Sequence, residues 1–215
     1  MAKKIESDVV VVGYGGAGAA AAITAHDNGA SVTILEKMPA GGGNTKIASG
    51  SFLNPTDMGA VRYIEALCFG STERPIIETF VEYAMKNNDW IREMGGETED
   101  RQTVDTEPIY PTIRQISWPQ APGSGSIARF SVKRSPEEVA TGQRFAAALR
   151  RLLAGNVEQR GVRILNGAPA KELMTNEKGQ VTGVVAERDG EKIFVKALRA
   201  VILTCGGFEY NEAMK

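Results

Sequence analysis

Residues 8–36 read DVVVVGYGGAGAAAAITAHDNGASVTILE, and this stretch decides the fold. The uncharged, β-branched run at 9–12 predicts a parallel strand that is buried on both faces. A helix is predicted from about residue 16 to 28, because alanine is the best helix former and Gly29 suits a left-handed helix end. A second strand at 31–35 then completes a βαβ unit.

Three glycines between the first strand and the helix have the spacing G-x-G-x-x-G. Gly13 permits a tight turn, Gly15 lets the backbone approach a pyrophosphate, and Gly18 lets the helix pack against the strand. Glu36 ends the second strand, where its carboxylate can accept both hydroxyls of a ribose and repel a 2′-phosphate. This order of elements predicts a dinucleotide site at the helix N-terminus. The alternative is a structural glycine-rich turn that binds nothing.

The next segment, residues 37–50, reads KMPAGGGNTKIASG. A proline and three glycines cannot continue a strand or a helix interior, so a loop is predicted. Its bare backbone suits close approach to a flat or charged ligand, with hydrogen bonds from Asn44, Thr45 and Ser49. A flexible linker of the same composition is the alternative interpretation.

The GGNT segment at 42–45, followed by ASG at 48–50, resembles the flavoprotein subunits of the fumarate reductase and succinate dehydrogenase type. Their superfamily includes 3-ketosteroid dehydrogenases and urocanate reductases. The resemblance implies that the first glycine motif holds the FAD pyrophosphate and that Glu36 binds the adenosine ribose. It also implies that GGNT runs beside the pyrophosphate and the isoalloxazine.

Two later anchors extend the resemblance. Ala170 matches the place where family members contact adenine through main chain. Residues 204–208 read TCGGF, where the family typically shows Ala-Thr-Gly-Gly-Phe closing over the pyrophosphate, so Thr204 and Cys205 are departures. Cys205 is predicted to be a small buried side chain rather than a reactive thiol.

The resemblance implies a set of FAD contacts and supplies neither a catalytic nor a metal-binding residue. The predicted contacts are Gly13, Gly15, Gly16, Ala17, Gly18, Glu36, Lys37, Gly42, Gly43, Asn44, Thr45, Ala48, Ser49, Gly50, Ala170, Thr204, Cys205 and Gly206. His26 is the only histidine and falls at the far end of the first helix, which argues against a Ser-His-Asp hydrolase. Two cysteines far apart in sequence suggest neither a disulfide framework nor a metal site.

The predicted fold class is α/β: a Rossmann-like FAD-binding domain with a parallel sheet, helices and a β-meander, incomplete at its C-terminus. The whole chain, 1–215, is predicted to be the N-terminal part of that domain. Residues 1–52 hold the βαβ unit and the GGNT loop, 53–134 form a mostly helical and loop insertion, and 135–211 form a helix, the meander and a closing strand.

Within the insertion, residues 57–68 and 71–95 have helical periodicity, the second with Ile76, Phe80, Ala84 and Ile91 on its apolar face. The polar, proline-rich stretch at 98–126 predicts a long surface excursion. Its Trp118 segment and nearby Arg129 are candidates for substrate contact, with a solvated loop as the alternative.

The net charge of −1 argues against nucleic-acid binding. No apolar segment follows the N-terminal lysines, so no secretory signal is predicted, and a cytoplasmic setting is expected. Residues 9–25 are uncharged and nearly long enough to span a membrane, but their four glycines and many alanines argue against a membrane span.

The resemblance implies a flavin-dependent oxidoreductase that reduces or dehydrogenates an activated C–C bond of a fumarate-like dicarboxylate or a 3-ketosteroid. In the family a capping domain and a C-terminal part of the FAD domain follow, so the isolated chain is predicted to be inactive. The implied partners are a small-molecule substrate and either a complementary chain or a missing C-terminal half. Two alternatives stay open: a non-catalytic FAD-binding module, and the NAD-binding domain of another dehydrogenase.

Overall fold

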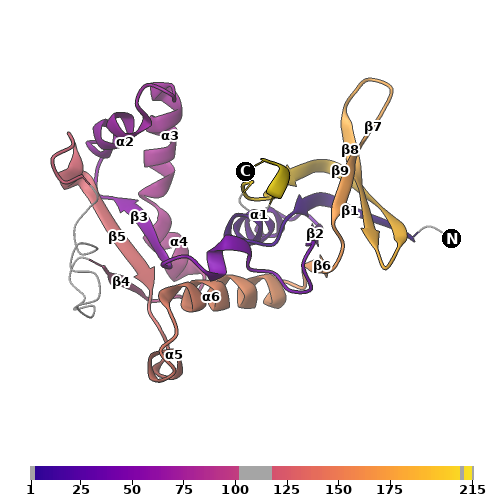
Figure 1. Ribbon diagram of the computed structural model, residues 1–215, viewed down its shortest axis with the longest axis horizontal. Coiled ribbons are helices and arrows are strands. Elements are labelled where there is room, and N and C mark those ends of the chain that lie inside the picture. Colours follow the sequence, from indigo (N-terminus) through magenta and orange to yellow (C-terminus); the bar gives the residue numbers. More distant parts are fainter. Residues whose placement is uncertain (1–2, 102–117, 209–210, 215) are drawn as a thin grey trace. The chain divides into compact units, whose positions relative to one another are not determined.

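The computed structural model describes residues 3–101, 118–208 and 211–214, which divide into two compact units (Figure 1). Unit 1 comprises residues 1–48 and 150–215, and unit 2 comprises residues 49–149. Each unit has its own sheet and its own cluster of buried apolar side chains.

Unit 1 is built on a six-stranded sheet with the strand order β6-β2-β1-β9-β8-β7. Neighbours are parallel from β6 to β9 and antiparallel from β9 to β7. The strands are β1 (Lys3–Val12), β2 (Val32–Leu35), β6 (Arg163–Leu165), β7 (Ala170–Thr175), β8 (Val181–Arg188) and β9 (Glu191–Leu203). Val10 and Val11 of β1 are fully buried, as expected of a strand covered on both faces.

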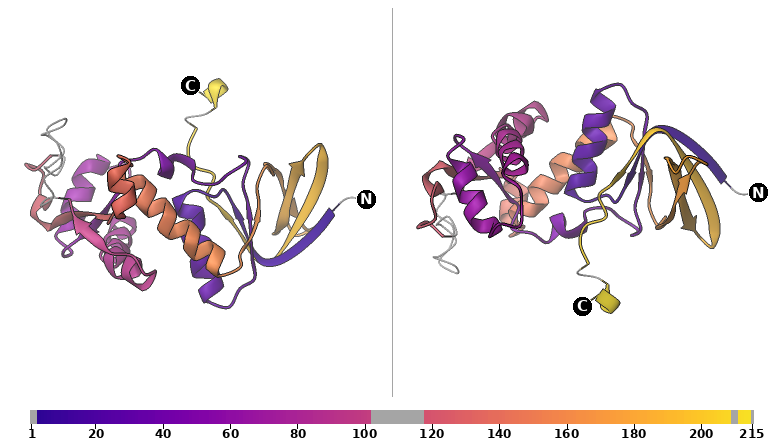
Figure 2. Two further views of the ribbon diagram at one scale, coloured as in Figure 1. Left: turned by 90° about the horizontal axis from the view of Figure 1, so that it is seen from below. Right: turned by 90° about the horizontal axis from the view of Figure 1, so that it is seen from above.

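Two helices of unit 1 lie side by side on one face of this sheet (Figure 2). These are α1 (Gly16–Asp27) and the part of α6 (Phe145–Gln159) that begins at Arg150. Their C-terminal ends are joined by Arg160, whose guanidinium donates to both carboxylate oxygens of Asp27 at 2.7 and 2.9 Å. These hydrogen bonds lower the pKa of Asp27.

The four parallel strands end together at one edge of the sheet. Val12 pairs with Leu35 and with Leu203, and Leu35 pairs with Leu165. The residues that follow these four ends are Gly13, Glu36, Asn166 and Thr204. Ligands of parallel α/β sheets bind at such a carboxyl edge, so the fold places these residues where a site is expected.

The β-meander is present, with one difference from the predicted pattern. Asp189 and Gly190, with φ of 53° and 79°, form the two-residue turn between β8 and β9. The sequence predicts the last strand of the meander and the closing strand as separate elements, and the structure joins them into the single strand β9. A register shift opposite Ser7 and Val9 of β1 accommodates the interruption, as a β-bulge does.

Unit 2 contains helices and also a three-stranded antiparallel sheet of order β3-β5-β4. Its strands are β3 (Ser51–Pro55), β4 (Thr98–Asp100) and β5 (Ile127–Val132). Its helices are α2 (Ala60–Cys68), α3 (Arg74–Ala84), α4 (Asn87–Glu93) and α5 (Pro136–Ala140). The sequence predicted helices and loop for 53–134 and missed this sheet, because its strands are short and pair across long stretches of chain.

Two details of unit 2 test the predicted helices. The helix predicted at 71–95 forms as two helices, α3 and α4. On its expected apolar face Ala84 and Ile91 are buried as predicted, but Ile76 and Phe80 are 59% and 49% exposed, and Ile77 and Val81 are buried in their place. The sequence carries two parallel apolar stripes here, and periodicity alone does not choose between them. Ser135 forms the N-cap of α5 in a capping box.

The predicted surface excursion lies mostly at 102–117, outside the described residues. In the described ranges, no helix has the length and apolar character needed to cross a bilayer.

Candidate functional site

The turn between β1 and α1 is held by close backbone packing. Gly13 has a φ of 104°, and a methyl group added to it would overlap with the carbonyl oxygen of Thr204. A methyl group on Gly18 would overlap with the Gly13 carbonyl oxygen. The Thr204 hydroxyl lies 2.8 Å from the Val12 carbonyl oxygen, to which it donates. The packing of the protein itself therefore requires glycine at positions 13 and 18.

Gly15 differs from these two glycines. Its φ of −89° is open to any residue, and a methyl group there would have only the Thr45 hydroxyl at 4.0 Å for a neighbour. Across the described ranges, no acceptor is found for the backbone N–H groups of Gly15, Ala17 and Gly18. Unbonded amides at the positive end of a helix suit an anion, and the open space at Gly15 lets one approach.

The GGNT segment crosses this turn as the short 3₁₀ helix η1 (Gly43–Lys46). The amide of Gly42 donates to the Tyr14 carbonyl at 2.6 Å. A methyl group on Gly43 would lie 3.4 Å from the Gly15 α-carbon, so the two glycine motifs are in contact. The Thr45 hydroxyl accepts a hydrogen bond from the Gly16 amide at 2.9 Å, which leaves its own hydrogen free to donate.

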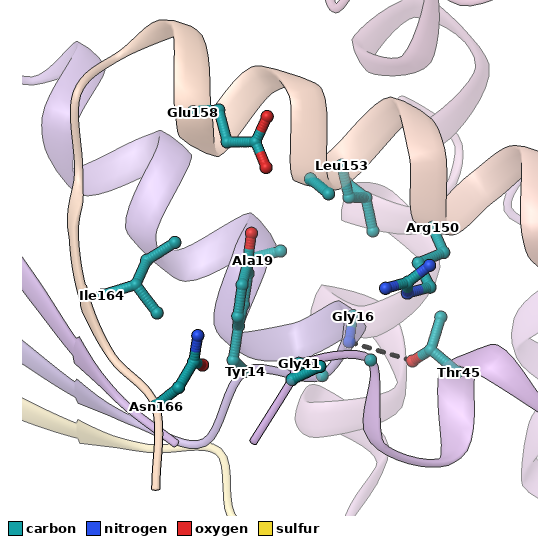
Figure 3. A pocket seen from close by; sticks show the side chains of 14 residues that line it. Tyr14, Gly16, Ala19, Gly41, Thr45, Arg150, Leu153, Glu158, Ile164 and Asn166 are labelled. Atoms are coloured by element: carbon teal, nitrogen blue, oxygen red, sulfur yellow. Dashed lines mark hydrogen bonds between the residues drawn. The ribbon is translucent and has the colours of Figure 1, made fainter. Parts of the chain in front are cut away.

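A pocket of about 190 Å³ opens between these two segments and α6 (Figure 3). It is lined by Tyr14, Gly15, Gly16, Ala19, Ala40, Gly41, Gly42, Thr45, Arg150, Leu153, Ala154, Glu158, Ile164 and Asn166. Sites for whole drug-sized ligands typically hold about 300–1,000 Å³, so this pocket suits one part of a dinucleotide.

Two buried polar atoms of the pocket make no hydrogen bond within the described residues. They are the Tyr14 hydroxyl and the Oδ1 of Asn166. Burial raises the pKa of Tyr14, and the charge of Glu158 raises it further, whereas Arg150 lowers it. Tyr14 therefore stays neutral, and its hydroxyl remains a donor for a polar ligand. Unsatisfied buried polar atoms call for such a partner.

Glu36 lies at the end of β2 and is 6% exposed. Its carboxylate accepts hydrogen bonds from the amides of Tyr14 and Met38, each at 2.8 Å. These bonds fix the carboxylate against the glycine turn, and it does not line the pocket. A carboxylate has about four acceptor positions, so two amides leave capacity for ribose hydroxyls. Ribose binding by Glu36 stays a prediction.

A family model described as an FAD binding domain matches residues 8–215. The chain belongs to this FAD-binding family. The predicted resemblance and the predicted cofactor, FAD, are confirmed by this match.

Relatives with curated names are longer than this chain. It is 32% identical to the NADH:fumarate oxidoreductase of Klebsiella pneumoniae (strain 342), over 96% of this chain and 21% of that protein. It is 23% identical to the 3-oxosteroid 1-dehydrogenase of Comamonas testosteroni, over 98% of this chain and 48% of that protein. The chain thus spans less than half the length of either relative.

Among solved structures, the fold matches a 3-ketosteroid-Δ4-(5α)-dehydrogenase from Rhodococcus jostii RHA1 with a TM-score of 0.79. The identity is 24%, over 98% of this chain and 48% of that chain. This likeness confirms the predicted α/β fold class of the FAD-binding family.

The site geometry fits the cofactor of the family. The space at Gly15, the unbonded amides of α1 and the donors of the GGNT segment provide for a diphosphate. The unpartnered polar atoms of Tyr14 and Asn166 provide for further hydrogen bonds to a polar ligand.

The structure brings several predicted FAD contacts of unit 1 together. Gly13 meets Thr204 and Cys205, and Gly15 meets Gly43. The remaining predicted contacts of unit 1 lie in or beside the same segments of sequence: Gly16, Ala17, Gly18, Glu36, Lys37, Gly42, Asn44, Thr45, Ala48 and Gly206. Cys205 is exposed, so the expectation of a buried side chain is wrong, because β9 ends before it.

Three predicted contacts are not among these residues. Ser49 and Gly50 belong to unit 2, where a methyl group on Gly50 would overlap with the backbone of Phe145 and Ala146. Ala170 begins β7, two residues after Ala168, whose amide donates to the Glu36 carbonyl at 2.8 Å. Contact between Ala170 and adenine stays a prediction, since Ala170 does not line the pocket.

Four polar residues of the pocket are absent from the contacts predicted from sequence. Tyr14 stands inside the glycine motif, and Asn166 follows the end of β6, where the carboxyl-edge rule would have indicated it. From sequence alone, the run of Arg144, Arg150 and Arg151 favours a solvated helix face, and no pattern singles out Glu158. Arg150 and Glu158 share a stripe of α6 with Ala154, at spacings of four residues, and that stripe faces the pocket.

Replacing Thr45 with valine should raise the Kd for FAD by about 10- to 100-fold, because a hydrogen bond to a charged group typically contributes about 1.5–3 kcal/mol. Valine keeps the shape of the side chain and removes both the acceptor for the Gly16 amide and the free hydroxyl donor. Quenching of FAD fluorescence on titration measures the Kd. Thr45→Ser retains the hydroxyl and should stay within about threefold of the unaltered protein; equal losses for both variants would contradict the hydroxyl's role.

Proposed function

We propose that this chain is the FAD-holding part of a flavin-dependent oxidoreductase that reduces or dehydrogenates an activated C–C bond. When bound, FAD supplies hydride exchange at its ring. Backbone amides of this chain bind the diphosphate and thereby orient the cofactor. The open space at Gly15 carries this proposal, because nothing in the protein's own packing requires glycine there.

The substrate class follows from the relatives. They include an NADH:fumarate oxidoreductase and a 3-oxosteroid 1-dehydrogenase. We infer that the substrate is a small molecule with a C–C bond next to an electron-withdrawing group, either a fumarate-like dicarboxylate or a 3-ketosteroid. Cytoplasmic location remains part of this proposal.

The 215 residues alone are proposed to bind FAD without turnover. Hydride transfer of this kind also needs a group that handles the proton on the neighbouring carbon. His26, the only histidine, lies in the last turn of α1, at the opposite end of the helix from the Gly13 turn. The proton-transfer group and the substrate contacts are therefore assigned to a complementary chain or to the length that the relatives have and this chain does not span.

Titration of the purified chain with FAD, and separately with NADH, tests the proposal. FAD should bind saturably and leave a flavin absorbance band after dialysis, whereas NADH should bind more weakly. Reduction of fumarate with a reduced dye, and dye-coupled oxidation of a ketosteroid, should both stay at background. A chain that binds NADH and not FAD would support the NAD-binding alternative; turnover by the isolated chain would contradict the assignment of the proton-transfer group elsewhere.

A further inference from the structure

Arg150 brings a positive charge to the edge of the glycine-rich site. It lies on α6 and lines the pocket, and its Nε would be 3.2 Å from a methyl group added at Gly42. In the described parts of the chain, no carboxylate forms an ion pair with Arg150. Its guanidinium is exposed and keeps its donors available to a ligand.

The charges along α6 divide the pocket into two ends (Figure 3). Arg150 lies at the end with Gly16 and Thr45, and Glu158 lies at the end with Ile164 and Asn166. Glu158 comes eight residues after Arg150, which corresponds to about 12 Å along a helix. An anion is therefore favoured at the first end and repelled at the second.

The polar groups at the Arg150 end all favour a negatively charged ligand. The Gly16 amide reaches the Thr45 hydroxyl at 2.9 Å, and that hydroxyl retains a hydrogen to donate. The N-terminus of α1 adds its positive dipole. A guanidinium fits phosphate oxygens through two parallel N–H groups, which an amide or a hydroxyl cannot do.

We propose that Arg150 binds the diphosphate of FAD, closing the anion site from the side opposite the β1–α1 turn. This inference rests on the proposed FAD binding and adds a contact on a helix far from the glycine motifs in sequence. The backbone amides offset only part of the negative charge of the diphosphate, and the guanidinium neutralises more of it. Arg150 thus acts as a cofactor-binding residue on α6.

The test measures the Kd for FAD at several NaCl concentrations for Arg150→Gln, Arg150→Lys and Arg163→Gln. Arg150→Gln should weaken binding about tenfold and flatten the dependence of Kd on salt, because a charged contact is screened by ions. Arg150→Lys keeps the charge and should recover part of the affinity and most of the salt dependence. Arg163 lies exposed at the start of β6 and does not line the pocket, so its replacement controls for net charge and should change neither quantity.

Thermal unfolding without FAD checks that each variant is folded. If Arg150→Gln binds FAD within twofold of the unaltered protein, with the same salt dependence, Arg150 lies in solvent and the inference is wrong. If Arg163→Gln weakens binding as much, overall charge rather than contact explains the effect, and the inference is also wrong. If the unaltered protein binds no FAD, the proposed function itself is wrong.

Discussion

Replacing Gly13 with alanine is expected to lower the free energy of unfolding by about 3 kcal/mol or more. Two causes add at this position. The φ of 104° is a conformation that alanine rarely adopts, and the new methyl group would overlap with the Thr204 carbonyl oxygen. Since Thr204 follows β9 and Gly13 follows β1, relief of the overlap must separate the ends of two paired strands.

Urea unfolding followed by circular dichroism measures this loss as a lower midpoint with an unchanged slope. Gly29→Ala is the matched control, because Gly29 has a φ of 80° and no atom within 4 Å of an added methyl group. It should lose only the backbone part, about 1–2 kcal/mol. Equal losses at the two positions would show that the contact with Thr204 contributes nothing.

The same contacts explain why residues 8–36 could be interpreted from sequence. A buried strand, a glycine turn and an alanine helix each have a local signature, and the predicted and observed elements agree closely there. Unit 2 lacks such signatures. Phe52 pairs with Phe130 across most of the unit, and β4 is three residues long, so its sheet depends on long-range pairing that local patterns do not reveal.

The residues of the site also differ in whether the sequence indicates them. Glycine motifs are local sequence features, and the structure brings Gly13, Gly15 and Gly43 into one cluster as the motifs indicated. Arg150 is different, because the face of α6 that meets the pocket depends on how the helix packs against α1. Sequence alone could not separate a cation that lines a pocket from a cation in solvent.

Gly15→Ala should raise the Kd for FAD by about 10- to 100-fold, which corresponds to about 1.4–2.7 kcal/mol. The added methyl group fills the space through which a phosphate reaches the unbonded amides of α1. Stability without FAD should fall by no more than about 1 kcal/mol, since Gly15 is the N-cap of α1 with a φ that alanine adopts readily.

Gly155→Ala controls for an added methyl group, because Gly155 lies within α6 and an added methyl group there would have no neighbour within 4 Å. It should leave the Kd unchanged. FAD-induced stabilisation against heat gives a second reading, since it falls as the Kd rises at a fixed FAD concentration. Alanine at Gly15 separates binding from folding, because Gly13 and Gly18 are needed by the protein's own packing and Gly15 is not. Unchanged FAD affinity in Gly15→Ala would place the diphosphate away from this turn, and the assignment of the α1 amides as its partners would then be wrong.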